Sequence, residues 1–374
     1  GRGDELVRAF AQRLKESLPK RAEIGRVGAG QFCVLYPDRK AMPDMDTIVR
    51  NLIHTMMKPY QLDRHSQSVN ISVGVVAIPK DGDDPTTLLR HSNLALQHAR
   101  LGGHGNWAVY QPEMSEVADY RRWIETELLT AFERGDFELY YQPQYDLTAG
   151  RIVGYEALLR WNHPMHGMIS PMDFVPIAEE TGMIEPIGRW ILRTACHDAL
   201  RLPGDCFVAV NISPVQFMNT EFISVVRKAL RESGLAPARL ELEVTETAMM
   251  QDRGRAAKIL EELAEIGISV AVDDFGTGYS NLSYLIDFSF HKLKIDKTFI
   301  DRLEADASSG AVVSTIVGLS RALGVNTIAE GVETESQATL LRAAGCDVVQ
   351  GNFYGRPAPL AAVFGKERVR ATVH

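Results

Sequence analysis

Polar and charged side chains stand near the end of almost every apolar, strand-like run in the later two-thirds of the chain. Packing residues are normally expected at such positions. The residues concerned are Glu156, Asn211, Glu243, Asp273, Asp274, Lys294, Glu330 and Gln350. A single strand-end carboxylate is usually a solvated cap. Five carboxylates meeting at one edge repel one another, and a bare pair ~4 Å apart costs about 4 kcal/mol.

Divalent cations would relieve this repulsion. Mg²⁺ and Mn²⁺ prefer oxygen ligands, which carboxylate and amide side chains supply. The neighbouring Asp273 and Asp274 suit a pair of metal ions, and two-metal sites are typical of enzymes that split phosphodiesters. The residue types therefore predict hydrolysis at phosphorus with Mg²⁺ or Mn²⁺ as cofactor, two ions in each site.

The elements that must position these residues alternate along residues 136–374. Strands are expected at 137–142, 152–159, 207–212, 240–246, 268–274, 290–296, 325–330 and 347–350. Helices are expected at 174–200, 215–233, 255–266, 310–323 and 336–344. Eight strands alternating with helices favour a (β/α)₈ barrel, with an open doubly wound sheet as the alternative. In a barrel, the strand ends meet at one mouth, where active sites are built.

The connection between the first two strands is the exception. Only residues 145–150 join them, which is too short for a parallel crossover, so we expect an antiparallel hairpin. A turn near Ala149 places Gln142 directly opposite Glu156. Gln142 is then either a substrate contact or an ordinary side chain of the barrel rim.

Arg160 follows Glu156 by four residues on the same expected strand. Side chains an even number of residues apart point to the same face of a strand. A guanidinium beside the acidic mouth suits a substrate phosphate oxygen.

An α/β block is expected in residues 1–112, and an amphipathic linker helix in residues 113–135. The barrel then occupies residues 136–374. Helical spacing is clearest at the start of the block and between Leu88 and Ala99. Short strand-like runs lie between these two segments, and another follows the second.

Composition narrows the range of partners. The 374 residues carry a net charge of −8, which argues against nucleic acid as the main partner. We find no apolar run long enough to span a bilayer and no secretory signal, and the four scattered cysteines indicate a reduced, cytoplasmic protein. Because the first residue is Gly, we expect a fragment without membrane contact of its own, whose full-length form could be tethered by an upstream segment.

The strand-end residues lie in motifs that resemble those of one known family. The motifs are Tyr155-Glu-Ala-Leu-Leu-Arg-Trp161, Asn211-Ile-Ser213, Glu243-Val-Thr-Glu-Thr247, Asp273-Asp-Phe-Gly-Thr-Gly-Tyr-Ser280, Lys294-Ile-Asp296, Ala329-Glu-Gly-Val-Glu333 and Gln350-Gly351. They are similar, in this order, to those of the EAL-domain family of cyclic di-GMP phosphodiesterases, which open the cyclic dinucleotide to linear pGpG. The resemblance covers about residues 120–365.

The resemblance implies a role for each matching position. One metal ion would be held by Glu156, Asn211, Glu243 and Asp273. Asp273 would bridge to a second ion together with Asp274, and Glu330 would act near that second ion, directly or through water. Lys294 would orient the attacking water or offset charge on the phosphoryl oxygens. The general base is left open between Asp273 and Glu330. Contacts to the substrate would come from Gln142, Leu159, Arg160, Asp274 and Gln350, while Asp296 and Glu333 would hold Lys294 and its neighbours in place.

The loop 275–280 couples the active site to a dimer interface in this family, and Glu246 anchors the loop. Both are intact here. We therefore predict a catalytically competent barrel that forms a homodimer through this domain. The alternative is a receptor that binds cyclic di-GMP without hydrolysing it.

The first block resembles the later part of a GGDEF domain, the diguanylate cyclase fold. The matching segments are Arg26-Val-Gly-Ala-Gly-Gln-Phe32, Ile71-Ser-Val-Gly74 and Ser92-Asn-Leu-Ala-Leu96. The signature acids are replaced by Gly30 and Gln31, and Pro19 and Ala22 stand at the Arg and Asp positions of the usual inhibitory nucleotide site. We expect a truncated, degenerate domain that regulates and does not synthesise cyclic di-GMP, since it lacks carboxylates to hold Mg²⁺ on GTP.

Overall fold

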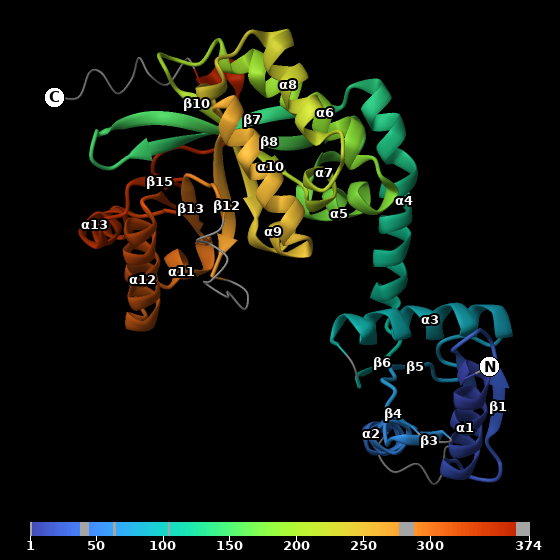
Figure 1. Ribbon diagram of the computed structural model, residues 1–374. Coiled ribbons are helices and arrows are strands. Elements are labelled where there is room, and N and C mark those ends of the chain that lie inside the picture. Colours follow the sequence, from blue (N-terminus) through green and yellow to red (C-terminus); the bar gives the residue numbers. More distant parts are fainter. Residues whose placement is uncertain (1, 38–44, 63–64, 104, 277–287, 364–374) are drawn as a thin grey trace. The chain divides into compact units, whose positions relative to one another are not determined.

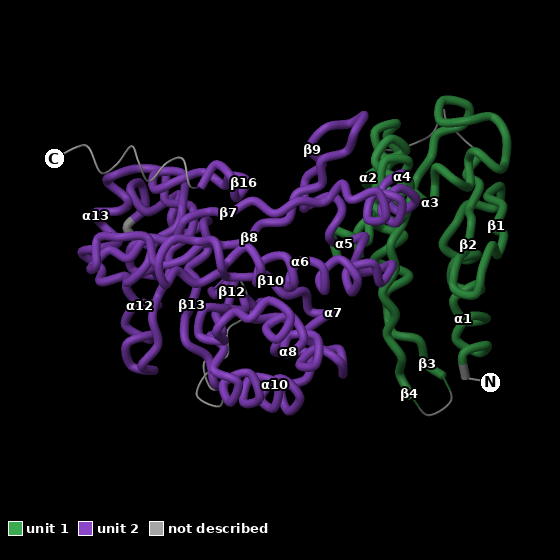
Figure 2. The backbone as a smooth tube through the Cα atoms, turned by 90° about the horizontal axis from the view of Figure 1, so that it is seen from above, with its two compact units in different colours: residues 1–122 green, residues 123–374 purple. Residues whose placement is uncertain are grey.

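The computed structural model describes residues 2–37, 45–62, 65–103, 105–276 and 288–363 (Figure 1). The chain divides into two compact units, residues 1–122 and 123–374 (Figure 2). The division falls inside one long helix, α4 (Pro112–Arg134). No helix in the described ranges is both long enough and apolar enough to cross a membrane.

The second unit is built on a closed ring of strands. Its strands are β7 (Phe137–Asp146), β8 (Arg151–His163), β9 (Gly167–Ile169), β10 (Phe207–Ile212), β11 (Leu240–Thr245), β12 (Ser269–Phe275), β13 (Lys292–Ile295), β14 (Asn326–Ala329), β15 (Val348–Gln350) and β16 (Ala358–Pro359). From β8 through β10 to β15, each strand pairs in parallel with the next. Strand β7 pairs antiparallel with both β8 and β15 and closes the ring of eight. The predicted barrel with an antiparallel first strand is confirmed, and the open sheet is excluded.

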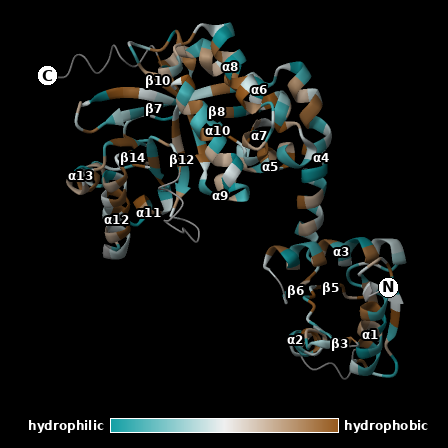
Figure 3. Ribbon diagram, viewed as in Figure 1, coloured by the Kyte–Doolittle hydropathy of each residue, from teal (hydrophilic) through white to brown (hydrophobic). Residues whose placement is uncertain are grey.

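Helices cover the ring between successive strands (Figure 1). They are α5 (Pro171–Thr181), α6 (Ile184–Ala199), α7 (Pro214–Phe217), α8 (Phe222–Ser233), the 3₁₀ helix η1 (Pro237–Arg239), α9 (Glu246–Gln251), α10 (Arg253–Ile266), α11 (Lys297–Asp301), α12 (Ala307–Leu323) and α13 (Glu335–Ala344). Hydrophobic and hydrophilic stretches lie side by side on the same helices (Figure 3), as an amphipathic covering helix requires. The apolar faces and the outward side chains of the strands form one continuous core.

Two of the expected helices are each broken in two. The expected helix 174–200 is wrong, because Gly182 takes a left-handed φ of 78° and ends α5 before α6 begins. Similarly, the expected helix 215–233 divides into α7 and α8. A capping box of Ser213 and Gln216 starts α7. The helix is then broken before α8, where the Asn219 side chain accepts a hydrogen bond from the Glu221 N–H at 2.8 Å.

Helix α4 contributes to the barrel core. Its buried residues Ile124, Leu128 and Ala131 belong to the same apolar cluster as the barrel strands. Trp123 stacks on the buried Trp161 of β8, with ring centroids 6.1 Å apart. The second half of α4 is therefore packed as part of the second unit.

The first unit is a smaller α/β assembly. Its elements are α1 (Arg2–Ser17), β1 (Glu23–Arg26), β2 (Phe32–Leu35), α2 (Met45–Met56), β3 (Tyr60–Leu62), β4 (His65–Gln67), β5 (Val73–Val75), α3 (Pro85–Leu101) and β6 (Trp107–Val109). Within the described residues its strands form three separate pairs, β1–β2, β3–β4 and β5–β6. Gly74 lets α3 lie directly on β5, because a Cβ there would stand 2.2 Å from the Ser92 carbonyl oxygen.

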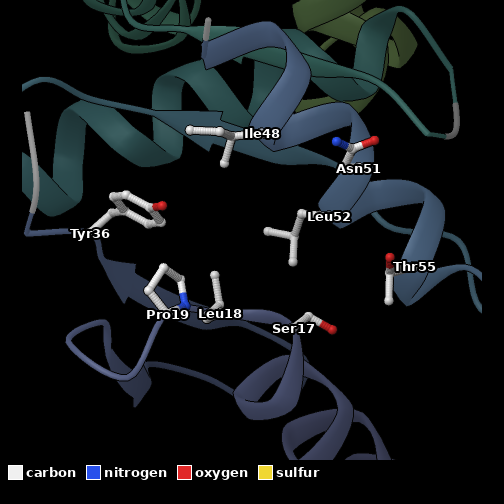
Figure 4. A pocket seen from close by; sticks show the side chains of 8 residues that line it. All are labelled: Ser17, Leu18, Pro19, Tyr36, Ile48, Asn51, Leu52 and Thr55. Carbon is white, nitrogen blue, oxygen red and sulfur yellow. The ribbon is translucent and has the colours of Figure 1, made fainter. Parts of the chain in front are cut away.

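A shallow pocket opens in the first unit between the end of α1 and the face of α2 (Figure 4). Its lining residues are Ser17, Leu18, Pro19, Tyr36, Ile48, Asn51, Leu52 and Thr55. None of these eight carries a charge. The described lining therefore offers no positively charged side chain to an anionic ligand.

Candidate active site

The predicted polar residues gather at the carboxyl end of the barrel because of strand register. Gln142 on β7 lies directly opposite Glu156 on β8, as the hairpin argument predicted. Glu156, Glu243, Lys294 and Gln350 are all at least 95% buried. The side chains that the sequence spreads over more than 200 residues therefore meet inside one ring of strands.

Lys294 is the centre of the cluster. Its Nζ lies 2.5 Å from Glu243 Oε2, 2.6 Å from Glu330 Oε1 and 3.2 Å from Asp273 Oδ2. Glu156 Oε1 is 4.0 Å away. One ammonium thus faces four carboxylates in a setting from which water is largely excluded.

An amide network also holds Glu156. Asn211 Nδ2 donates to Glu156 Oε1 at 2.6 Å, and Gln350 Nε2 donates to Glu156 Oε2. The same Gln350 amide also donates to Gln142 Oε1 at 2.9 Å, and Gln142 Nε2 donates to the Gly355 carbonyl at 3.1 Å. The two glutamines are thereby fixed beside Glu156 at the mouth.

The excess of acid over base shifts the pKa values of the cluster. Burial raises the pKa of Glu156, but Lys294 and the Gln350 and Asn211 hydrogen bonds outweigh burial and bring that pKa below its usual range. Glu243 has its pKa raised well above normal by burial and by the charge of Glu156. Burial likewise raises the pKa of Glu330 to about 7, although Lys294 opposes this. The single positive charge of Lys294 can therefore neutralise only part of the negative charge of the four carboxylates.

Lys294 itself stays positively charged. Burial disfavours its charged form, but the carboxylates of Glu243 and Glu330 together outweigh burial and raise the pKa of Lys294 well above normal. A fixed positive charge is therefore built into the acidic cluster.

Asp273 and Asp274 lie near the end of β12 and differ in backbone conformation. Asp274 has a left-handed φ of 55°, which is uncommon for a residue with a side chain. Its backbone N–H donates to Asp273 Oδ1 at 2.8 Å. Burial and the neighbouring charges of Asp273 and Asp296 raise the pKa of Asp274. The turn brings two carboxylates next to each other, and backbone strain of this kind commonly marks a functional site.

The donor chemistry of the mouth fits hard divalent cations. Its side chains are carboxylates and amides, and the buried Oε1 atoms of Glu243 and Gln350 accept no hydrogen bond from the described residues. In the described ranges, no three His, Cys, Asp or Glu side chains are placed to hold one ion as they stand. The carboxylates of Glu243, Asp273 and Glu330 contact the Lys294 ammonium instead.

Arg160 and Leu159 lie further along β8. Arg160 donates from Nη1 to the Leu159 carbonyl at 2.8 Å, and its guanidinium carbon is 5.5 Å from the centre of the Tyr140 ring. Burial lowers the pKa of Arg160, while the charge of Glu156 opposes this. Leu159 is partly buried and packs against the barrel core.

Three further predicted residues lie outside the cluster. Asp296 caps α11 by accepting from the Thr298 N–H at 3.0 Å, and Glu333 pairs with Lys297 at 2.8 Å. Neither is bonded to Lys294 among the described contacts, and Asp296 acts on the site through its charge, which raises the pKa of Asp274. Glu246 is buried at the start of α9. The loop 275–280 that it was expected to anchor lies outside the described residues beyond Gly276.

The sequence reasoning missed a second ion pair inside the barrel. Lys292 Nζ lies 2.7 Å from Glu241 Oε2, and both side chains are buried. Ser269 Oγ donates to the same Glu241 oxygen at 3.0 Å. The signal was present in the alternation of Glu241 with Glu243 and of Lys292 with Lys294, which directs each pair of side chains to one face.

A closed (β/α)₈-type barrel with an acidic, amide-rich mouth at its carboxyl end defines the class of protein. Comparison with family models gives the particular family. Residues 125–357 match the EAL domain, and residues 1–106 match the diguanylate cyclase GGDEF domain. The chain belongs to the EAL-domain family, as the motifs predicted.

Relatives and solved structures agree with this assignment. The bifunctional diguanylate cyclase/cyclic di-GMP phosphodiesterase MucR of Pseudomonas aeruginosa is 38% identical over 361 residues, which cover 96% of this chain and 53% of that protein. The structure of the PaMucR phosphodiesterase in complex with c-di-GMP is 44% identical with a TM-score of 0.63, and the match covers 64% of this chain and 99% of that one.

A second solved structure, the EAL enzyme Bd1971 in its cAMP- and cyclic-di-GMP-bound form, is 33% identical with a TM-score of 0.64. The match covers 76% of each chain. The present chain spans about half the length of the curated relatives that it matches.

Proposed function

We propose that the barrel hydrolyses cyclic di-GMP to linear pGpG with the help of Mg²⁺ or Mn²⁺. The observation that carries this proposal is the meeting of four carboxylates around the buried Lys294 beside the Gln142–Gln350 amide pair. Relatives whose names include cyclic di-GMP phosphodiesterase support the choice of substrate.

Two divalent ions would neutralise the surplus acid of the mouth. The residues proposed to hold them are Glu156, Asn211, Glu243 and Asp273 for one ion and Asp273, Asp274 and Glu330 for the other. When bound, such ions polarise the phosphoryl group and lower the pKa of water.

The protein's own side chains supply orientation and fixed charge. Lys294 keeps a positive charge where negative charge develops on the phosphoryl oxygens, and a preorganised cation in a buried site is effective there. Arg160 would bind a phosphate oxygen of the substrate. Gln142, Gln350 and Leu159 would contact the guanine bases, and Asp274 would contact the substrate from the end of β12.

The reaction consumes one water molecule for each phosphodiester opened. The water oxygen bonds to phosphorus, the bond from phosphorus to O3′ breaks, and O3′ takes up a proton from solvent to become a hydroxyl group. The proton lost by the water goes to a carboxylate oxygen of Asp273 or Glu330, both of which lie within hydrogen-bonding distance of Lys294 Nζ. The phosphate stays bonded through O5′ to one guanosine and the other guanosine carries the freed 3′-hydroxyl, which gives linear pGpG.

The proposal extends to the first unit and to assembly. The GGDEF-like unit would regulate the barrel without making cyclic di-GMP, because the turn that carries the family signature contains no acid. A homodimer through the barrel is part of the same proposal, and sedimentation equilibrium of the purified chain tests it.

The test of function is chromatography of cyclic di-GMP incubated with the purified protein and Mg²⁺ or Mn²⁺. We expect conversion to pGpG by the unaltered chain and none by Glu156→Ala, because that carboxylate would hold a metal ion. Turnover that survives in Glu156→Ala would show the metal assignment to be wrong. Binding without any turnover in the unaltered chain would favour the receptor function instead.

A further inference from the structure

The barrel interior contains two acid–ammonium pairs, one above the other. Each pair joins β11 to β13 across β12: Lys294 with Glu243 at the mouth, and Lys292 with Glu241 below it. The two residues of each strand are separated by two positions, so the layers lie roughly 6–7 Å apart. The lower pair belongs to neither the proposed metal ligands nor the substrate contacts.

The two pairs differ in how completely they are satisfied. Glu241 accepts from Lys292 through both carboxylate oxygens, at 3.0 and 2.7 Å, and from Ser269 Oγ as well. The Lys292 ammonium also rests 3.8 Å from the centre of the Phe207 ring. In the mouth, by contrast, one ammonium serves four carboxylates, and Glu243 Oε1 has no hydrogen-bond partner among the described residues.

The lower ammonium is therefore a potential competitor for the upper acids. A buried charge without a partner is costly, and lysine carries its charge on a flexible four-carbon stem. If Glu241 lost its charge, the nearest surplus of negative charge would be the layer above, roughly 6–7 Å away by strand spacing. Lys292 would then neutralise carboxylates that a divalent cation needs.

We propose that Glu241 is a positioning residue for the metal site. By holding the Lys292 ammonium in the lower layer, it leaves the carboxylates of the mouth available to Mg²⁺ or Mn²⁺. The inference rests on the proposed function, since it assumes that the mouth binds these ions.

The experiment compares Glu241→Gln, Lys292→Met and the double variant by calorimetric titration with Mn²⁺ alone, after circular dichroism has shown each to be folded. We expect Glu241→Gln to bind Mn²⁺ about tenfold more weakly, which corresponds to ~1.4 kcal/mol. Lys292→Met should bind at least as well as the unaltered chain. The double variant should recover most of the lost affinity, because the competing ammonium is gone.

A purely structural role for the pair gives a different pattern. Both single variants would then weaken Mn²⁺ binding alike, and the double variant would recover nothing, which overturns the proposal. Turnover provides an independent check: the deficit of Glu241→Gln should shrink as Mn²⁺ is raised, because competition with an ammonium can be overcome. A deficit that persists at saturating Mn²⁺ would count against it.

Two outcomes separate this inference from the proposed function. If the unaltered chain neither binds Mn²⁺ nor hydrolyses cyclic di-GMP, the proposed function fails. If it does both and Glu241→Gln is unchanged, only the positioning role fails. Should Glu241→Gln not fold, Glu241→Asp replaces it: the shortened carboxylate should give a smaller loss that Lys292→Met again removes, and no loss or no recovery overturns the proposal.

Discussion

The barrel mouth and the turn between β1 and β2 are two contrasting surroundings for charge. In the mouth, Glu156, Glu243, Asp273 and Glu330 face Lys294 and leave negative charge unbalanced. In the turn, the guanidinium of Arg26 donates to the Gly28 and Ala29 carbonyls at 3.1 and 3.0 Å. The Val27 N–H closes the turn on the Gln31 carbonyl at 3.1 Å.

The mouth and the turn differ in what holds each of them together. The β1–β2 hairpin is held by backbone groups and one arginine, and its 28–31 turn contains no acidic side chain. The mouth contains four carboxylates around Lys294, and one ammonium cannot neutralise all of their negative charge. The turn is therefore closed without acidic side chains, whereas the mouth is built from them.

Removing the central cation of the mouth should give the largest effect. We expect Lys294→Met to reduce kcat for cyclic di-GMP hydrolysis by about 10²- to 10³-fold, since it removes a preorganised positive charge near the reacting phosphoryl group. Lys258→Met, at an exposed lysine of α10, is the matched control and should retain full turnover. Comparable kcat values for the two variants would remove Lys294 from the proposed machinery.

Supplying divalent metal should stabilise the barrel. At a hundredfold excess over its dissociation constant, Mn²⁺ should add about 2.7 kcal/mol to the free energy of unfolding. The shift in melting temperature, read by calorimetry and reversed by a chelator, measures this. Glu156→Ala should show a smaller shift, and equal shifts in both proteins would place Mn²⁺ binding outside the mouth.

The stability of the metal-free chain should depend on pH through the raised pKa of Glu330. The folded pKa of Glu330 is about 7, above its ordinary value of 4.5, so the folded state holds this proton where the unfolded state has lost it. Stability therefore falls as pH rises from about 4.5 to 7, and the loss is complete above 7.

Glu330→Gln removes that contribution. In the presence of a chelator, urea unfolding between pH 5 and 7.5 should show a shallower fall in stability for the variant than for the unaltered chain. Parallel curves would mean that Glu330 does not hold its proton in the folded protein.

The smallest effect should come from GTP. Because the 28–31 turn has no carboxylate to hold Mg²⁺ on a triphosphate, GTP should change the rate of cyclic di-GMP hydrolysis by less than about twofold, which is below 0.5 kcal/mol. A larger, saturable change in the titration would show that the first unit senses the nucleotide, and that the lack of acids in the turn does not prevent nucleotide binding.

Much of the barrel was readable from the sequence because its strands are marked twice, by apolar runs and by polar ends. The pairing of Gln142 with Glu156 was predicted from the short 145–150 connection, but it also depends on a register shift between Gln144 and Tyr145 that the sequence did not indicate. Helix breaks were harder to predict: Gly182 interrupts a continuous apolar pattern, and only its left-handed conformation ends α5. In the first unit, α2 has readable helical spacing that was overlooked, whereas β3 and β4 are too short to show any period.

The site was predictable as a set of residues and less so as a geometry. The order of the motifs placed the acids at the mouth. Their contacts with Lys294 depend in addition on the relative register of the strands that carry them, which the sequence does not show. The Glu241–Lys292 pair escaped prediction because charged residues in a barrel interior contradict the usual apolar pattern. Their pairing distance of 2.7 Å is a property of β11 and β13 together, which neither run discloses alone.

The packing of α4 has a consequence for how such barrels can be exchanged between proteins. Ile124 and Leu128 complete the barrel's core from a helix that precedes its first strand, and burying each is worth roughly 1.5–3 kcal/mol. A barrel transplanted from Asp136 onward would forfeit these contributions, against a typical total of about 5–15 kcal/mol. The unit that can be exchanged between proteins is therefore the barrel together with the second half of α4. Recombination upstream of Trp123 would preserve this unit.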